Sequence, residues 1–556
     1  MEGMKRTVEA NAAKRFTRRE ALFAGGVVTV GALASSLLGG CSGAASSSSA
    51  ESWDKEADLV VVGAGTGLYT ALRAREEGLS VIVLEKGAKP GGSTLYSSSV
   101  VWAPANKLME QNGDKDSKAD ALAYLAAGSG ETYLPDHAEA FVDNVNIALD
   151  NVTRLAGVEW VYWAPGIDYR SDLPGGRTIG RSLCPKVEKD QAIAGVLGGA
   201  LVSSAEKAGV EIMAKTPATQ LVTRVSDDGS TEVLGVVAKD GKSEMKIRAK
   251  RAVVMSSGGF DWNESMMKTY LRVPALYSWG TPDGTGDGQR MAMKAGCDLS
   301  FMNEAWLSPG YKVEYEEARA MGASKLSTAI RDDCKRGVIY VNKHGKRFTN
   351  ECSNYDSVGR SFCALENGVE PRGWQNLPAF AIADQAAVDT YGLNGGKPGQ
   401  PGAAFKQYGS IEELAQACGI DAAGLAEELA QYNDHARNGS DPDFGRGQDY
   451  YGQHYVGGDS NYEGAARTLA PLETGPFWAA EVVPVVLGTM GGMKIAANAR
   501  VLDTDGNEVK RLFAHGNCAG VGCGGAFYAG GGGTLGPSLA FGEIAAAQLS
   551  SLEAWS

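Results

Sequence analysis

A tyrosine followed by a run of glycines has the residue types that could bind and polarise a flat ligand. Tyr528 precedes the four consecutive glycines of 530–533, and residues 534–537 (Thr-Leu-Gly-Pro) lead into an alanine-rich helical pattern. Glycines let a backbone approach a ligand with its N–H groups uncovered, and Pro537 suits the first turn of a helix. The helix N-terminus would then present free donors and partial positive charge to an electron-rich ring edge. The alternative is a glycine-rich surface loop that closes the fold.

A dinucleotide-binding pattern lies near the other end of the chain. The apolar run 58–62 enters the glycine turn 63–67, a helical pattern follows, and a second apolar run, 81–84, ends at an acid. In such a βαβ unit the glycines admit a pyrophosphate to the helix N-terminus, and the acid binds a ribose hydroxyl. The third glycine falls one position early, and a Rossmann-like domain without a nucleotide is the alternative. The candidate cofactor-binding residues of this unit are Gly63, Gly65, Gly67, Glu85 and Lys86.

Further glycine-bearing segments extend the predicted cofactor site. Residues 91–94 (Gly-Gly-Ser-Thr) resemble the second phosphate-and-flavin loop of FAD enzymes, which favours FAD over NAD. A buried strand pattern ends at 258–259, a Gly-Asp pair opens a helical pattern at 286–287, and the apolar run 512–515 leads to another turn. The candidates that these segments and the final helix add are Gly92, Ser93, Thr94, Gly258, Asp287, Gly516, Asn517, Gly536, Ser538 and Leu539.

The size and patterning of the chain indicate two main domains. The 556 residues are 44% hydrophobic, enough for a large core. Residues 301–487 change to shorter strands and polar or Pro/Gly-rich loops, with an amphipathic helical pattern over 411–429. We therefore expect an α/β fold with a Rossmann-like FAD-binding domain that is discontinuous, over 54–300 and 488–556. An inserted smaller α+β domain, 301–487, would cap the flavin and supply catalytic residues.

Charge and metal-type residues exclude some function classes. A net charge of -13 makes the chain a poor nucleic-acid binder, because that affinity rests on neutralising phosphates. The nine cysteines form no CxxC pair, so we expect mostly buried thiols, and the five histidines share no metal-type spacing. No metal site is predicted. His515, beside the glycine turn at 516, is expected to be a supporting or core residue.

The first 41 residues are predicted to be a targeting segment. Thr17-Arg18-Arg19 begins a twin-arginine pattern, an apolar run follows, and Leu38-Gly-Gly-Cys41 resembles the processing box of bacterial lipoproteins. That resemblance implies cleavage before Cys41 and diacylation of its sulfur, with 42–53 as a flexible tether. The protein would then be exported and lipid-anchored on the outer face of the bacterial cytoplasmic membrane. An uncleaved transmembrane helix is the alternative.

Three tyrosines stand in contexts that together resemble one family. The contexts are residues 163–169, 350–355 and 528–532, and residues 488–492 (Gly-Thr-Met-Gly-Gly) and 534–542 accompany them. They look like those of the 3-ketosteroid Δ1-dehydrogenases, a branch of the fumarate reductase/succinate dehydrogenase flavoprotein superfamily. The superfamily resemblance covers nearly everything from 56 to 550. The steroid branch is favoured because Leu487 and Gly488 stand where a fumarate-type enzyme is expected to place histidine.

The resemblance implies a role for each residue of this group. The Tyr528 hydroxyl and the Gly532 N–H would hold a ketone oxygen, and Tyr355 would exchange the proton on the adjacent carbon. Tyr169 would hydrogen-bond to Tyr355 and ease its ionisation, and flavin N5 would exchange hydride with the next carbon. A tyrosine with a pKa near 10 is a poor base at neutral pH, so it needs a donor or a positive neighbour. The alternative for each tyrosine is a packed aromatic with a satisfied hydroxyl.

The sequence thus predicts a flavoenzyme that acts on a C–C bond next to a ketone, with a hydrophobic, steroid-like substrate. The resemblance implies desaturation first. The same site could also run in reverse and reduce an enone, such as a cardenolide. The electrons would then come from a membrane carrier, either a quinone or a cytochrome. One alternative is a respiratory reductase of small carboxylates of the fumarate or urocanate type. Another is a lipoprotein that binds flavin or steroid without turnover.

Overall fold

A parallel pair of strands joined by a helix carries the dinucleotide-binding pattern in the computed structural model. β1 (Lys55–Val62) pairs with β2 (Val81–Leu84), and α1 (Gly67–Glu76) connects them. The predicted βαβ unit is therefore confirmed. The structure describes residues 52–274, 277–323, 329–368, 372–455 and 458–555. The predicted targeting segment and Cys41 lie outside these residues.

The βαβ unit belongs to an eight-stranded sheet in the order β17-β18-β8-β9-β1-β2-β6, with β7 paired to β8. Its remaining strands are β6 (Glu211–Met213), β7 (Ala218–Val225), β8 (Thr231–Asp240), β9 (Ser243–Met255), β17 (Arg500–Leu502) and β18 (Glu508–Ala514). β9 pairs in parallel with β1 and also with β18, so the end of the chain returns to the first sheet as predicted. β17 and β18 form an antiparallel hairpin.

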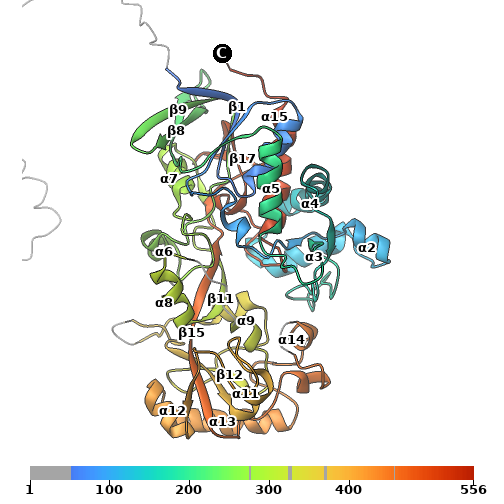
Figure 1. Cartoon of the computed structure of the whole chain (residues 1–556), viewed down its shortest axis with the longest axis vertical. Helices are drawn as coiled ribbons and strands as arrows, with labels where there is room; N and C mark the ends of the chain where they lie inside the picture. Colours follow the sequence, from blue (N-terminus) through green and yellow to red (C-terminus); the bar gives the residue numbers. More distant parts are fainter. Residues whose placement is uncertain (1–51, 275–276, 324–328, 369–371, 456–457, 556) are drawn as a thin grey trace, which may run out of the picture. The chain divides into compact units, whose positions relative to one another are not determined.

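Helices cover this sheet and bring the end of the chain to its start. α15 (Leu535–Leu549) packs against both α1 and α4 (Pro135–Ala156), and α5 (Val196–Lys207) packs against α1. Figure 1 shows α5 and α15 next to the sheet. α15 is buried over most of its length because its sequence, rich in alanine, leucine and glycine, has almost no polar face.

A second sheet of five strands forms the other half of the molecule, in the order β11-β15-β13-β12 with β14 paired to β15. All its pairings are antiparallel. Its strands are β11 (Ala305–Tyr311), β12 (Val338–Asn342), β13 (Ala379–Asp384), β14 (Lys406–Tyr408) and β15 (Phe477–Thr489). These strands come from the region predicted to form the inserted domain, although β15 runs one residue past the predicted boundary at 488. Residues Ser52–Ser556 pack as one compact unit, so the boundary stays a prediction.

The remaining elements are short. Two small sheets contain β3 (Val101–Trp102), β4 (Trp160–Tyr162) and β5 (Ser182–Pro185), and β10 (Leu299–Ser300) with β16 (Gly492–Met493). The other α-helices are α2 (Lys107–Asn112), α3 (Lys118–Ser129), α6 (Glu264–Tyr270), α7 (Asp287–Lys294), α8 (Lys312–Ala320), α9 (Ala329–Asp332), α10 (Tyr355–Ser361), α11 (Gln385–Tyr391), α12 (Ile411–Cys418), α13 (Ala422–Arg437) and α14 (Tyr450–His454). Within the described ranges, no helix combines the length and apolar character that crossing a membrane requires.

The helical pattern predicted over 411–429 is wrong in its extent. It forms two helices, α12 and α13, because Gly419 ends the first in a left-handed conformation with φ of 68°. Asp421 then starts the second by accepting hydrogen bonds from the N–H groups of Ala423 and Gly424.

Candidate active site

The hydroxyls of the three predicted tyrosines form one hydrogen-bonded chain. The Tyr169 hydroxyl donates to Tyr355 at 2.7 Å, and the Tyr355 hydroxyl donates to Tyr528 at 2.9 Å. Each pair of rings packs edge to face. The ring centroid of Tyr169 lies 5.2 Å from that of Tyr355 and 5.2 Å from that of Tyr528, and the last two lie 5.6 Å apart. We call Tyr169, Tyr355 and Tyr528 the phenol cluster. Residues that lie far apart in the sequence thus meet at one place in the molecule.

Three different segments supply the phenol cluster. Tyr355 is the first residue of α10, whose N-terminus is capped by the Asn354 side chain. Asp356 accepts a hydrogen bond from the N–H of Leu307 at 2.8 Å, which fixes α10 against β11. Tyr169 lies in the loop between β4 and β5, and Tyr528 lies in the loop before α15. Both halves of the molecule therefore contribute to the cluster.

Hydrogen bonds hold the glycine-rich loop beside Tyr528. The Ala529 carbonyl accepts from the Tyr124 hydroxyl at 2.6 Å and from the N–H of Tyr169 at 3.1 Å. The Ser182 hydroxyl donates to the Gly531 carbonyl at 2.9 Å. These bonds connect the loop directly to the backbone of Tyr169.

Gly532 needs to be glycine for two reasons. Its φ of 90° is a conformation that side chains disfavour, and a Cβ would lie 2.5 Å from the backbone nitrogen of Trp102. Within the described part of the chain its N–H donates to no acceptor. This donor is therefore available to a ligand, as the predicted role requires.

A buried carboxylate supports the same region. Asp168 accepts hydrogen bonds from the indole N–H of Trp102 at 2.8 Å and from Arg181 at 2.9 Å. Its side chain and that of Arg181 are fully buried. Burial raises the pKa of Asp168 to about 6, and Arg181 opposes that shift. Because Trp102 packs on Gly532 and Asp168 precedes Tyr169, this network fixes the loop and the phenol cluster relative to each other.

The phenols are neutral in the free protein at neutral pH. Burial raises the pKa of Tyr169 and Tyr355 well above the ordinary value of 10.0, and raises that of Tyr528 as well. The hydrogen bond from Tyr169 lowers the pKa of Tyr355, but the effect of burial is larger. A proton can therefore move to or from Tyr355 only together with charge stabilisation elsewhere, such as polarisation of a ketone.

A small pocket lies next to the phenol cluster, beneath the N-terminus of α15. Gly516, Asn517 and Ser538, which were predicted to bind the cofactor, line it together with Trp306, Thr534 and Pro537. The Trp306 ring lies 5.8 Å from that of Tyr528. This cavity therefore connects the predicted flavin residues with the phenol cluster. Helix N–H groups at this N-terminus suit the electron-rich edge of a flavin ring system.

The first glycine turn also fits a dinucleotide. Gly63 has φ of 106°, and a Cβ there would lie 2.2 Å from the Ser256 carbonyl, so the turn packs directly on the end of β9. The Glu85 carboxylate accepts hydrogen bonds from the N–H groups of Ala64 at 3.1 Å and Gly87 at 2.6 Å. Burial raises the pKa of Glu85, and these two bonds oppose the shift. The acid is thus held at the end of β2, where a ribose would lie.

The other predicted cofactor residues surround these two places. Gly92, Ser93 and Thr94 form a short 3-10 helix, and Thr94 packs close to Gly65. Lys86 forms an ion pair with Asp287 at 2.7 Å, which links the second strand to α7. Gln289, which was not predicted, donates to the carbonyls of Gly258 at 3.2 Å and Gly491 at 3.1 Å. The roles of these residues toward a cofactor stay predictions.

His515 is a core residue, as expected. It is fully buried, its Nε2 lies 3.0 Å from the Thr70 hydroxyl, and burial lowers its pKa to about 4. The expectation of buried thiols also holds among the described cysteines, because six of the eight are buried and all are free. The His435, Asp441 and Asp443 side chains come close enough for a cation, but Asp441 already forms two hydrogen bonds with Arg347.

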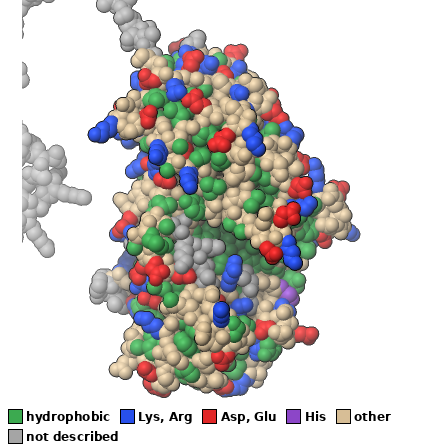
Figure 2. All heavy atoms as spheres, in the orientation of Figure 1, with side chains coloured by type: hydrophobic (Ala, Val, Ile, Leu, Met, Phe, Trp, Pro, Cys, Tyr) green, Lys and Arg blue, Asp and Glu red, His purple; other side chains and the backbone are tan. Residues whose placement is uncertain are grey.

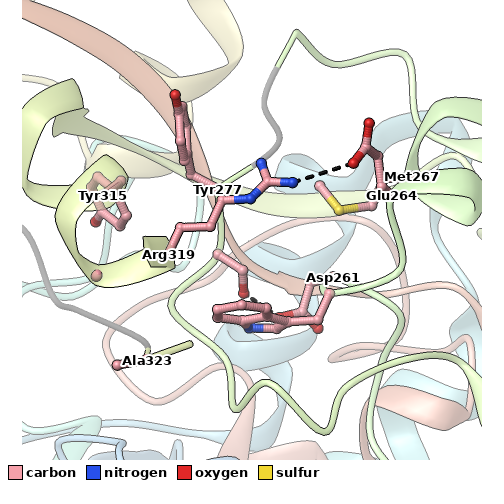
Figure 3. A pocket seen from close by; sticks show the side chains of 10 residues that line it. Asp261, Glu264, Met267, Tyr277, Tyr315, Arg319 and Ala323 are labelled. Atoms are coloured by element: carbon pink, nitrogen blue, oxygen red, sulfur yellow. Dashed lines mark hydrogen bonds and ion pairs between the residues drawn. The ribbon is translucent and has the colours of Figure 1, made fainter. Parts of the chain in front are cut away.

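A larger cavity, of about 420 Å³, lies between α6 and α8 and contains none of the predicted site residues. Figure 3 shows Arg319 pointing across it to Glu264, an ion pair of 3.2 Å, with Asp261 on the opposite wall. Trp279 connects this region to the phenol cluster, since it donates to the Tyr315 hydroxyl and its ring lies 6.2 Å from that of Tyr355. Figure 2 shows a hollow with hydrophobic side chains across the middle of the molecule.

Several residues of the site were missed by sequence reasoning. Trp306 joins the cofactor cavity to Tyr528, and Tyr451 and Tyr455 pack against Tyr169 at 5.6 and 6.2 Å. Trp102 fixes the glycine loop. None of these residues lies in a glycine or tyrosine motif, and only the spacing of Tyr451 and Tyr455, four apart on one helical face, could have drawn attention to them.

Comparison with known proteins agrees with this geometry. Residues 58–535 match the family model described as FAD binding domain. The 3-oxosteroid 1-dehydrogenase of Mycolicibacterium smegmatis is 31% identical over 90% of this chain and 98% of its own length. The 4-oxocyclohexanecarboxylate 2-dehydrogenase of Sinomonas cyclohexanicum is 32% identical over 88% of this chain and 92% of its own length. The crystal structure of the 3-ketosteroid delta1-dehydrogenase from Sterolibacterium denitrificans, in complex with 1,4-androstadiene-3,17-dione, has a TM-score of 0.81 and 27% identity, covering 89% of this chain and 100% of that one.

Proposed function

Because the chain belongs to the FAD-binding flavoprotein family that includes the 3-oxosteroid 1-dehydrogenases, we propose that it transfers a hydride and a proton across the C–C bond next to the ketone of a steroid-like cyclic substrate. The chain is an FAD-dependent oxidoreductase of CH–CH bonds. The observation that carries the proposed substrate chemistry is the hydrogen-bonded chain of Tyr169, Tyr355 and Tyr528 beside the cavity for the cofactor.

The first step of the proposed mechanism is to hold the ketone. The hydroxyl of Tyr528 and the free N–H of Gly532 would donate to its oxygen, and the resulting polarisation makes the adjacent C–H more acidic. FAD, when bound, supplies the redox chemistry by accepting or giving the hydride at the neighbouring carbon. The loop of 529–532 is already held by Tyr124 and Ser182, so binding does not have to order it.

The second step is proton transfer through Tyr355. In desaturation this phenol takes the proton from the carbon next to the carbonyl, and in the reverse reaction it returns one. The raised pKa of Tyr355 disfavours a free phenolate, so its ionisation needs the hydrogen bond from Tyr169 and the developing enol together. Aromatic walls from Trp306 and the tyrosine rings would favour a flat, apolar ring system over a small dicarboxylate.

Anaerobic flavin spectroscopy tests this function and its direction. Holoenzyme is mixed with ring-A-saturated and ring-A-unsaturated 3-ketosteroids, with 4-oxocyclohexanecarboxylate, and with fumarate. Bleaching of oxidised flavin by a saturated ketone supports desaturation, and reoxidation of reduced flavin by an enone supports reduction. Rapid reoxidation by fumarate with no response to any ketone would contradict the proposal.

We also propose that the protein is exported by the twin-arginine route and lipid-anchored at Cys41, so that a membrane quinone or cytochrome could exchange electrons with it. The support is the sequence of residues 17–41. Two acyl chains anchor stably where one does not. Fractionation of cells producing wild type and Cys41→Ser tests this anchor. We expect the wild type in the membrane fraction and the variant in the soluble fraction, and equal distributions would contradict the anchor.

A further inference from the structure

Tyr169 lies at the centre of a larger group of tyrosines than the proposed reaction uses. Its ring packs edge to face against Tyr355 and Tyr528 on one side, and against Tyr451 and Tyr455 of the α14 region, with interplanar angles of 70° to 90°. Tyr169 itself is 2% exposed, whereas Tyr355 and Tyr455 are both half-buried. A buried phenol thus connects two phenols that reach toward solvent.

The proposed reaction creates a need for such a connection. Each turnover places one proton on Tyr355, or removes one from it. A bound substrate would cover the accessible part of Tyr355, because that phenol must contact the reacting carbon. The proton therefore has to leave or arrive through the protein, and the one hydrogen-bond partner of Tyr355 that does not also hold the ketone is Tyr169.

Among the described aromatic neighbours of Tyr169, Tyr455 is the one that can continue the path to solvent. Tyr528 is 5% exposed and is committed to the ketone. Tyr451 is 3% exposed, so it gives the proton no exit to solvent. Its ring stacks on that of Tyr455 at 4.5 Å and so fixes the position of Tyr455.

From this arrangement we infer that Tyr455 is the outer member of a proton relay, Tyr355–Tyr169–Tyr455, that exchanges the substrate's proton with solvent. The inference rests on the proposed function. The rings of Tyr169 and Tyr455 lie 6.2 Å apart at an interplanar angle of 81°. Burial raises the pKa of Tyr455, and hydrogen bonding with the hydroxyls of Tyr169 and Tyr451 opposes that shift. The step between these two phenols is direct or passes through one bridging water.

The relay conserves protons and electrons. In desaturation the C–H bond next to the carbonyl breaks and its proton goes to the Tyr355 oxygen, while the Tyr355 proton passes to Tyr169. Tyr169 passes its proton to Tyr455, and Tyr455 releases one to water. The electron pair leaves with the hydride that FAD accepts. In the reverse reaction each O–H transfer runs inward, in the direction in which Tyr169 already donates to Tyr355.

The test separates proton exchange from hydride transfer in the holoenzyme. One measurement follows single-turnover flavin bleaching by a ring-A-saturated 3-ketosteroid. The other keeps the flavin reduced with dithionite, so that hydride transfer is blocked, and follows loss of deuterium from a ketone labelled on the carbons next to the carbonyl. The variants are Tyr455→Phe and, as a matched control on the adjacent helix α14, Tyr450→Phe, whose ring is 48% exposed and stacks on His454.

We expect Tyr455→Phe to bind FAD and to bleach in a single turnover nearly as fast as wild type, but to lose deuterium about a hundredfold more slowly. Tyr450→Phe should match wild type in both measurements. Wild-type deuterium loss in Tyr455→Phe would overturn the relay, and so would an equal slowing of both measurements, which would indicate a packing role. Bleaching without deuterium loss in wild type would overturn the relay and leave the proposed function intact. If the wild type shows neither signal with any cyclic ketone, the proposed function fails and the relay with it.

Discussion

Two buried polar clusters meet the two ends of the short segment 351–355, and they differ in charge. The phenol cluster contains neutral hydroxyls whose pKa values are raised by burial. The second group, which we call the charged cluster, contains Arg347, Glu351, Asp441 and Arg446, with side chains that are fully buried. Glu351 pairs with Arg347 at 2.8 Å and with Arg446 at 3.0 Å.

The charged cluster stays ionised because each charge has a partner. Burial alone would raise the pKa of Glu351, but Arg347 and Arg446 hold it at about 2. Glu351 also accepts a hydrogen bond from the N–H of Tyr340 on β12, and Arg446 donates to the Val338 carbonyl. These contacts fix the chain just before Tyr355. The comparison indicates that paired charges provide rigidity here, while the neutral hydroxyls, hydrogen-bonded to one another, can exchange protons.

The largest effect on chemistry is expected at Tyr355. Tyr355→Phe removes the group that exchanges the proton, so flavin bleaching by a saturated 3-ketosteroid should slow by about 10²–10⁴-fold. Stopped-flow absorbance measures this rate. The matched control is Tyr340→Phe, which removes another buried hydroxyl that has no partner among the described residues and should leave the rate unchanged. Equal rates in Tyr355→Phe and wild type would remove Tyr355 from proton transfer.

A substitution in the charged cluster should lower the stability of the fold more than it lowers the reaction rate. Glu351→Gln leaves Arg446 without a carboxylate partner among the described residues and leaves Arg347 with Asp441 alone, so the free energy of unfolding should fall by about 3–5 kcal/mol. Denaturant unfolding of the holoenzyme measures the change. An unchanged midpoint would contradict the assigned structural role. Flavin bleaching per folded molecule should change far less than in Tyr355→Phe.

The pH dependence of stability follows from the same carboxylate. The pKa of Glu351 is lowered from 4.5 to about 2 in the folded chain, so its ion pairs stabilise the fold above the unfolded pKa. This contribution is lost as pH falls from about 4.5 toward 2. Glu351→Gln should therefore flatten the acid side of the stability profile. If the free energy of unfolding falls equally with decreasing pH in wild type and in the variant, this linkage is contradicted.

A smaller effect is expected from one of the two donors to the ketone. Tyr528→Phe keeps the Gly532 N–H and should lower kcat/KM for the ketone by about 10²–10³-fold, with FAD still bound. Steady-state kinetics measures kcat/KM, and the flavin absorbance spectrum shows whether FAD is bound. A variant that retains most of the wild-type kcat/KM would exclude the Tyr528 hydroxyl from the mechanism.

The smallest effect should come from a support of the glycine loop. Ser182→Ala removes the hydrogen bond to the Gly531 carbonyl, which is worth about 1 kcal/mol, so kcat/KM should fall about fivefold. Ser551→Ala removes a similar bond on an exposed turn and serves as the control. A loss as large as that of Tyr528→Phe would mean that the loop depends on Ser182 for its conformation.

Local patterns in the sequence were enough to predict much of the fold. The βαβ unit, the hairpin of β17 and β18 and the final helix each depend on residues close together in the chain. The helix expected over 411–429 failed for a local reason as well, because the left-handed conformation of Gly419 is not visible from hydrophobic spacing. Family resemblance, not periodicity, indicated that Tyr169, Tyr355 and Tyr528 act together.

The supports of the site could not be predicted in the same way. Asp168, Trp102 and Arg181 meet through contacts between segments that no spacing rule connects. Tyr455 and Trp306 reach the site because α14 and β11 pack against it. Such contacts depend on tertiary packing, and a single sequence holds no local signal for them.

The central claim is that Tyr528 and Gly532 polarise a ketone beside the flavin. Infrared difference spectroscopy of a 3-ketosteroid labelled with ¹³C at its carbonyl, bound to oxidised holoenzyme at low temperature, tests it most directly. We predict a C=O stretch at lower frequency than in water for wild type, with a shift back toward the value in water for Tyr528→Phe. The same frequency in both proteins, equal to that in water, would contradict the account.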